Sequence, residues 1–286
     1  MQLGKIRRPS GDAVVLVESG RLFTLDLGRQ PGLATLADVL HSTNPLQAAK
    51  SIIDASIQPE PLGSQTFLAP IDRQEVWAAG VTYKRSKVAR EEESKGAAQF
   101  YDKVYTAPRP ELFMKATPER VVHPGKPIRV RADSKWSVPE PELTLVVSPS
   151  LKIVGYTIGN DVSSRDIEGE NPLYLPQAKI YKQSCSLGPL ITLVDAMLAF
   201  AEVEIRLAIR RGGTIAFEGT TSLAQLNRTP ESLVEWLGRE NEFPNGVFLL
   251  TGTGIVPPDE FNLSNGDSVD ISISGIGTLT NPVVSG

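Results

Sequence analysis

The sequence has few cysteines, few histidines and no long apolar run. Its 286 residues include one cysteine, Cys185, and two histidines. One cysteine cannot form a disulfide within the chain, which excludes a disulfide-stapled fold. No run approaches the roughly 18 apolar residues of a membrane helix, and the basic residues of segment 1–8 precede no apolar signal region. We therefore expect a cytoplasmic protein that does not associate with membranes.

An excess of charge of either sign is also missing. The chain carries 29 Lys and Arg against 33 Asp and Glu, a formal net charge of −4. Because no basic stripe stands out, nothing favours a nucleic-acid partner. A hydrophobic fraction of 41% and a charged fraction of 22% are typical of a globular protein with a substantial core. The length suits one large domain, alone or with a small one.

The first 72 residues predict a small α+β domain. Short apolar runs between residues 4 and 27 alternate with Gly and Ser, as in β-hairpins. Residues 35–40 and 45–56 predict two short helices. Pro59, Pro61 and Pro70 then indicate a linker. We place the domain boundary near residue 72, which leaves residues 73–286 as the main domain.

The main domain reads as mostly β. Alternating runs on either side of Gly212 and Gly213 predict a hairpin, and Thr229 followed by a proline predicts the start of a helix. Residues 267–273 predict a last strand, and the polar residues 163–178 predict a long loop. No alternation of strands and helices and no internal repeat is present. The predicted fold class is therefore α+β and mostly β, with little support for a Rossmann fold or a TIM barrel.

Three acidic residues stand out for their spacing. Glu140 and Glu142 lie two apart at the start of an apolar run that predicts a strand, so both carboxylates share one face. Asp161 follows nineteen residues after Glu142, at the end of another predicted strand. Like charges this close repel unless a hard cation such as Mg²⁺ lies between them. Two solvated glutamates at a strand end are the alternative.

Seven motifs in order resemble the fumarylacetoacetate hydrolase superfamily, from about residue 75 to residue 286. They are Gly80-Val81-Thr82-Tyr83, Phe113-Met114-Lys115, Glu140-Pro141-Glu142-Leu143, the run 155–166 (GYTIGNDVSSRD), Cys185-Ser186-Leu187-Gly188-Pro189, Leu250-Thr251-Gly252-Thr253-Gly254, and the run 275–283 (GIGTLTNPV). The resemblance implies a mixed β-roll catalytic domain behind a smaller N-terminal domain. It also implies a homodimer or larger homo-oligomer.

For the metal, the resemblance implies a Mg²⁺ site, with Mn²⁺ as the alternative, whose ligands are Glu140, Glu142 and Asp161. A small 2-oxoacid would chelate the cation through its carboxylate and 2-oxo oxygens. The proton on C3 then becomes acidic, and the cation stabilises the enolate as a Lewis acid. Lys179 matches the lysine beside the metal, where it stabilises enolate charge or moves protons.

For the substrate, the resemblance places Thr253 and Gly252 at the bound carboxylate and Tyr83 in the first site motif. Arg165 and Tyr174, in the polar segment 163–178, are candidate contacts for distal hydroxyls, although such a loop is equally consistent with a solvated surface. The glycines around Thr253 also serve a tight turn.

One departure from the family pattern bears on the reaction. Hydrolytic members carry a histidine a few residues after the tyrosine of the first motif, whereas this chain has Lys84-Arg85-Ser86-Lys87 there, and neither His41 nor His123 is in that register. The usual water activator is therefore missing. Glu91 or Glu92, in a predicted exposed helix over 87–101 that is either a solvated surface helix or a lid, are candidate bases.

Two segments, 81–86 and 175–185, resemble the subgroup of 2-keto-3-deoxy-arabinonate dehydratases. That resemblance implies a lyase of pentose degradation, which forms 2,5-dioxopentanoate through a metal-stabilised enolate. The alternatives are an acylpyruvate hydrolase or oxaloacetate decarboxylase on the same metal site, or an inactive binding protein.

Overall fold

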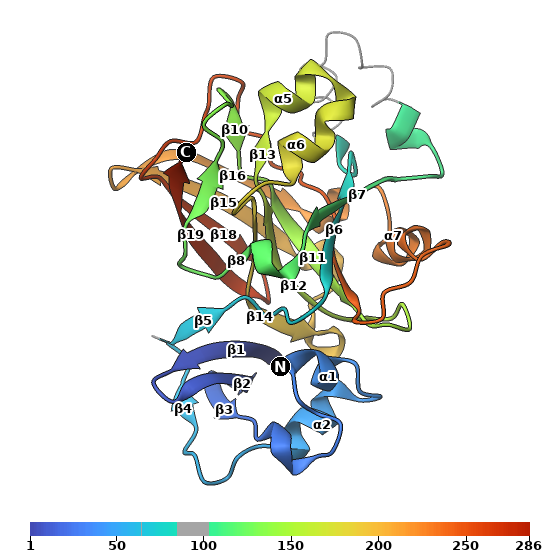
Figure 1. Ribbon diagram of the computed structural model, residues 1–286, viewed down its shortest axis with the longest axis vertical. Coiled ribbons are helices and arrows are strands. Elements are labelled where there is room, and N and C mark those ends of the chain that lie inside the picture. Colours follow the sequence, from blue (N-terminus) through green and yellow to red (C-terminus); the bar gives the residue numbers. More distant parts are fainter. Residues whose placement is uncertain (64, 85–102) are drawn as a thin grey trace.

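The computed structural model describes residues 1–63, 65–84 and 103–286, which form an α+β fold dominated by strands (Figure 1). A smaller N-terminal lobe lies below a larger body in that view. In the described part of the chain, no helix has the length and apolar character needed to cross a membrane.

The N-terminal lobe packs two helices against a small set of strands. Its elements are β1 (Gln2–Arg8), β2 (Gly11–Glu18), β3 (Arg21–Thr24), β4 (Glu60–Pro61), β5 (Thr66–Leu68), α1 (Leu36–Leu40) and α2 (Pro45–Ser51). Thr35 and Asp38 form a capping box at the start of α1, and the Asn44 side chain caps α2. Both expected helices are therefore confirmed, although α2 ends before residue 56.

One twelve-stranded sheet runs through both parts of the molecule, in the order β4-β3-β2-β1-β14-β12-β11-β17-β6-β7 with β5 and β8 paired at its side. Its remaining strands are β6 (Glu75–Gly80), β7 (Glu111–Ala116), β8 (Val121–Val122), β11 (Pro141–Val147), β12 (Ile153–Asp161), β14 (Cys185–Leu193) and β17 (Val247–Leu250). The antiparallel pair β1 and β14 joins the sheet of the lobe to that of the larger body. Since the sheet is continuous, a domain boundary near residue 72 stays a prediction.

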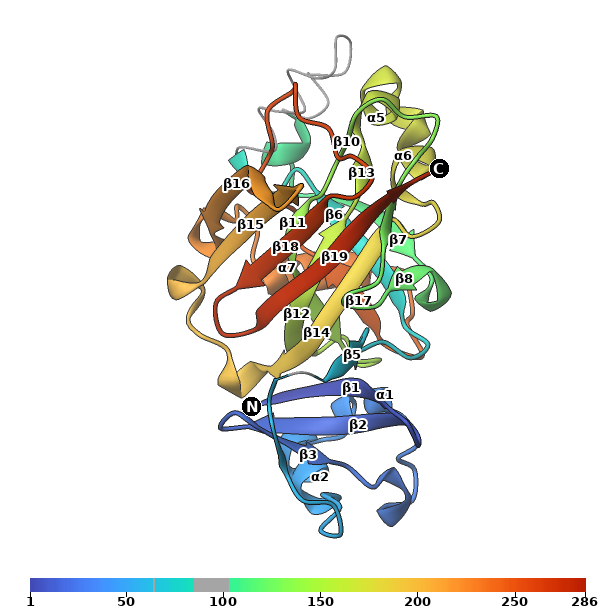
Figure 2. The same ribbon diagram turned by 90° about the vertical axis from the view of Figure 1, so that its left-hand side faces the viewer.

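A second sheet of five strands packs over this one and is seen from its outer side in Figure 2. Its strands are β16 (Thr214–Ser222), β15 (Glu204–Arg211), β18 (Ser268–Ile273), β19 (Gly277–Ser285) and β9 (Ile128–Val130), in that order. The main core lies between the sheets, where Leu143 and Leu145 of β11 join Ile205 and Leu207 of β15. Alternation in β11 therefore turns Glu142, Thr144 and Val146 to the opposite face of the large sheet.

Two expectations about the main domain are wrong. Residues 163–178 are not a loop, because they contain β13 (Ser163–Ser164), which pairs with β10 (Ser137–Val138), followed by α5 (Arg165–Glu170) and α6 (Leu175–Lys179). These helices have five or six residues, too few for an apolar period to identify them. Residues 267–273 are not the last strand either, since β19 follows. Because β19 begins with a glycine and contains Pro282, its sequence does not have the pattern of a strand. The expected helix after Thr229 is α7 (Pro230–Leu237).

Candidate active site

The antiparallel hairpin of β11 and β12 brings the three acidic residues together. Pro141 pairs with Asn160, and the Asp161 N–H donates to the Glu140 carbonyl at 3.0 Å, so residues 21 apart in sequence lie side by side. Glu140, Glu142 and Asp161 are only 4%, 1% and 1% exposed. One carboxylate oxygen from each lies within 4.8 Å of the other two. The alternative of two solvated glutamates does not hold in this fold.

Three buried cations surround this triad. Lys179 Nζ lies 2.9 Å from Glu140 Oε2 and 3.2 Å from Asp161 Oδ2, and it donates to Ser163 Oγ at 2.6 Å. Lys115 forms an ion pair with Asp161 from the other side. Arg165 Nη2 lies 3.0 Å from Glu140 Oε1. Each cation therefore orients a carboxylate that it contacts.

Lys115 also joins three elements through its ammonium group. Besides its ion pair, it donates to the Val162 carbonyl at 3.0 Å and to the Lys179 carbonyl at 2.6 Å. Both β12 and the end of α6 are thereby held to β7. The side chain is fully buried, so each of these contacts is formed away from water.

The environment of Glu142 indicates whether the site suits a cation. The Gly252 N–H donates to its Oε2 at 2.6 Å. Burial raises the pKa of Glu142 well above its usual range, and repulsion from Asp161 and Glu140 adds to the increase. A divalent cation among the three carboxylates would remove that repulsion, and an all-oxygen donor set suits Mg²⁺ or Mn²⁺. The residues therefore fit a hard divalent cation.

The triad lines a narrow cavity together with residues from β6, β7, α5, α6 and the segments that follow β6 and β17. Its volume is about 20 Å³, room for an ion or a single water. The described residues that line it are Ala79, Gly80, Val81, Glu111, Phe113, Glu140, Glu142, Asp161, Glu168, Lys179, Gly252 and Thr253. A second cavity, of about 340 Å³, is lined by Val104, Pro110, Glu111, Leu112, Glu168, Pro172 and Leu175. Glu111 and Glu168 belong to both linings, so the two cavities adjoin at these glutamates.

Of the five residues predicted to bind substrate, the structure places only some at the cavity. Thr253 and Gly252 line the narrow cavity beside the triad, and Gly252 takes a φ of +91°, which glycine accommodates without strain. Arg165, expected to contact hydroxyls, instead contacts the metal-ligand candidate Glu140. Tyr83 is buried and lines neither cavity in the described part of the chain, and burial raises its pKa. Tyr174 is 37% exposed and is absent from both linings as the structure describes them.

Two other predicted residues, Glu91 and Glu92, and the helix expected over 87–101, lie outside the described residues. Two glutamates that are not among the predicted site residues, Glu111 and Glu168, line the cavity. Glu111 shares one face of β7 with Phe113 and Lys115, because residues two apart in a strand face the same way. Counting back from Lys115 in steps of two would have predicted that Glu111 faces the same side of the strand. No comparable signal pointed to Glu168.

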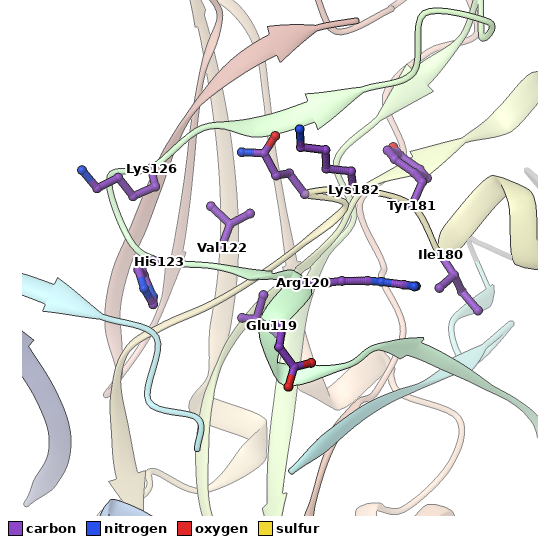
Figure 3. Close-up of a pocket in the computed structure, with 10 residues that line it drawn as sticks. Glu119, Arg120, Val122, His123, Lys126, Ile180, Tyr181 and Lys182 are labelled. Atoms are coloured by element: carbon purple, nitrogen blue, oxygen red, sulfur yellow. The ribbon is translucent and has the colours of Figure 1, made fainter. Parts of the chain in front are cut away.

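A larger cavity of about 560 Å³ lies away from the triad, beside β8 and residues 180–183 (Figure 3). Basic groups border it, including Arg120, Lys126 and Lys182. In Figure 3 the side chains of Arg120 and Lys126 point in opposite directions, so they do not converge on one anion. The chemistry is therefore concentrated at the smaller cavity.

Comparison with known proteins agrees with this geometry. Residues 75–284 match the model of the fumarylacetoacetate (FAA) hydrolase C-terminal family. The chain is 45% identical over 260 residues, 91% of its length and 89% of the relative's, to a "Probable 2-keto-3-deoxyxylonate dehydratase" of Haloferax volcanii. It is 46% identical over 217 residues, 75% of its length and 73% of the relative's, to a 2-dehydro-3-deoxy-D-arabinonate dehydratase of Saccharolobus solfataricus.

Solved structures give the same comparison over the whole chain. A 2-keto-3-deoxy-D-arabinonate dehydratase complexed with magnesium and 2,5-dioxopentanoate superposes with a TM-score of 0.82 at 35% identity, covering 100% of this chain and 99% of that one.

Proposed function

Because the chain belongs to the fumarylacetoacetate hydrolase family, we propose that it is a Mg²⁺-dependent dehydratase that converts 2-keto-3-deoxy-arabinonate to 2,5-dioxopentanoate. The observation that carries the proposal is the buried triad of Glu140, Glu142 and Asp161, whose ligand oxygens lie within 4.8 Å of one another. A structure of similar fold contains magnesium and 2,5-dioxopentanoate.

The names of the relatives agree on the chemical class of the substrate. Arabinonate and xylonate differ at C2 and C3, and a 2-keto-3-deoxy acid has no stereocentre at either carbon. Both names therefore describe a five-carbon 2-oxoacid with hydroxyls at C4 and C5 and one stereocentre, at C4. Assays need only the two C4 enantiomers to cover both.

Glu140, Glu142 and Asp161 are the residues that would hold the cation. When bound there, Mg²⁺ supplies Lewis-acid chemistry that acidifies the C3 protons of a chelating 2-oxoacid. Lys115 and Arg165 act as positioning residues, since each contacts one of these carboxylates from a buried site.

Three further groups act on the substrate in this proposal. Lys179 lies between two of the carboxylates and places its positive charge where enolate charge develops. Gly252 and Thr253 border the cavity at the end of β17 and receive the substrate carboxylate. Glu111 enters the cavity from β7 and removes a proton from C3.

The alternative, an acylpyruvate hydrolase or oxaloacetate decarboxylase, has less support. Neither histidine of the chain lines the cavity in the described structure. His123 Nδ1 accepts the Ala69 N–H, and His41 is the C-cap of α1. We further propose, on composition and family alone, a cytoplasmic homodimer or larger homo-oligomer that acts in pentose degradation.

The test is turnover of both C4 enantiomers of 2-keto-3-deoxy-pentonate with Mg²⁺, with 2,5-dioxopentanoate detected directly. EDTA should abolish the activity and Mg²⁺ should restore it. Glu142→Gln should weaken Mg²⁺ binding, measured by calorimetry, by at least tenfold, whereas Glu170→Gln, on the exposed end of α5, should not. If neither enantiomer yields the product while an acylpyruvate is cleaved, the dehydratase assignment fails.

A further inference from the structure

Two glutamates mark the junction between the metal cavity and the adjoining 340 Å³ cavity. Glu111 comes from β7 and Glu168 from α5, and both line both spaces. The rest of the second cavity is apolar. A substrate chelated through C1 and C2 at the triad extends C3, C4 and C5 away from the cation. Of the described residues, these two carboxyls are the acidic groups where that chain leaves the metal cavity.

The position of Glu168 is fixed by its own helix. Arg165, three residues earlier and so on the same side of α5, contacts Glu140 Oε1 at 3.0 Å. Asp166 accepts hydrogen bonds from Ser134 Oγ and the Lys135 N–H, both at 2.7 Å. The helix is thereby attached to a metal-ligand candidate on one side and to the chain before β10 on the other. Glu168 itself is only 4% exposed, so its carboxyl is held at the junction.

The reaction requires proton transfers at two places on the substrate. A proton leaves C3, and the C4 hydroxyl leaves as water, which gives a double bond between C3 and C4. A proton must then leave C5 and one must return to C3, and the C4–C5 enol finally becomes the aldehyde. A second acid–base group near C4 and C5 would divide these transfers with the base near C3.

Resting on the proposed function, we infer that Glu168 is a second catalytic carboxyl, which protonates the hydroxyl leaving C4 and then accepts the proton from C5. The Glu111 carboxylate takes the C3 proton, the C4–O bond breaks, and the hydroxyl leaves as water with the proton of Glu168. Glu168, now a carboxylate, takes a proton from C5 while Glu111 returns its proton to C3.

The protons balance over the whole reaction, so no further acid or base is required. In the last step Glu168 gives its proton to C4 and takes the proton of the enol hydroxyl at C5. Glu111 ends as a carboxylate and Glu168 as a carboxylic acid, as each began. The products are one 2,5-dioxopentanoate and one water. C5 is oxidised from alcohol to aldehyde while C4 is reduced from CHOH to CH2 within the same molecule, so no outside oxidant or reductant is needed.

The experiment separates the two carboxyls by the steps they serve. The probe for the first step is 2-oxopentanoate, a five-carbon 2-oxoacid without hydroxyls, whose C3 protons exchange with D₂O when the site forms the enol. Exchange is followed by NMR, and dehydration of 2-keto-3-deoxy-pentonate is measured in parallel. The variants are Glu168→Gln, Glu168→Asp, Glu111→Gln and the matched control Glu170→Gln. Thermal unfolding and Mg²⁺ affinity report on folding.

Glu168→Gln should keep the C3 exchange rate and the Mg²⁺ affinity within threefold of the parent protein, yet lose 10²- to 10⁴-fold in dehydration. Glu168→Asp should restore part of that loss, and Glu111→Gln should lose both reactions. The inference is overturned if Glu168→Gln dehydrates within threefold of the parent, or if it loses C3 exchange as fully as Glu111→Gln. Failure of the proposed function is distinguishable, because the parent protein itself would then release no product.

Discussion

Replacing Lys115 by methionine tests how far the site is held by buried charge. Methionine has a similar volume, so packing is largely kept. The change removes the ion pair with Asp161 and the hydrogen bond at 3.0 Å to the Val162 carbonyl, and it leaves the Lys179 carbonyl with the Ser184 hydroxyl, 2.8 Å away, as its donor. Breaking a buried pair by deleting one partner costs about 3–5 kcal/mol. Since Lys179 still contacts Asp161 at 3.2 Å, we expect the lower end, about 3 kcal/mol.

The assay is thermal unfolding of the Lys115→Met variant with EDTA and with Mg²⁺. A loss of about 3 kcal/mol corresponds to a Tm lower by roughly 6–12 °C for a domain of this size. Mg²⁺ at about 100 times its Kd should return roughly 2.7 kcal/mol, because the cation binds only the folded protein. Lys152→Met, at an exposed position, is the control and should unfold like the parent. A Tm unchanged in EDTA would refute the reasoning that Lys115 compensates Asp161.

Three further predictions concern other parts of the fold. Burial, together with nearby positive charge, lowers the pKa of His123 below its ordinary 6.5, so near that pH the unfolded chain binds a proton that the folded chain does not. Urea unfolding should therefore show the free energy of unfolding falling as the pH drops below about 6.5. The variant His123→Asn, whose amide oxygen can also accept the Ala69 N–H, should remove part of this pH dependence. Gly80→Ala should lower kcat with little change in Tm, because its added Cβ would lie 2.0 Å from the mobile end of Glu111; wild-type kcat would argue against a role for that carboxylate. Gly252→Ala, at φ +91°, should lower both Tm and kcat/KM, and a fully active variant of normal stability would show that the turn tolerates a side chain.

The cluster of three carboxylates could be expected because part of its signal lies in local spacing. Glu140 and Glu142 share a face through the period of two, and the apolar runs after Glu142 and before Asp161 predict the strands that carry them. The spacing alone does not predict the register between those strands. The hydrogen bond from the Asp161 N–H to the Glu140 carbonyl is a property of the folded hairpin. Only the family resemblance implied that Asp161 lies beside the two glutamates.

The catalytic surroundings were harder to predict. Arg165 and Glu168 lie on a six-residue helix, too short for an apolar pattern, so the segment resembled a polar loop. Arg165 was assigned to substrate on its polarity, whereas its partner is a glutamate 25 residues earlier in the chain. Glu111 lies in a strand whose period was visible, but a lone glutamate at a strand start is usually solvated. Tertiary contacts decided each case.

The pairing of β1 with β14 has a consequence for how the protein can be divided. Gln2, Leu3 and Gly4 are opposite Thr192, Ile191 and Leu190, in the middle of a continuous sheet. A chain shortened to begin at residue 73 would lose that neighbour and expose the backbone donors and acceptors of a buried, apolar strand. Such an edge invites pairing with another molecule. We therefore expect fragments that lack the N-terminal lobe to precipitate.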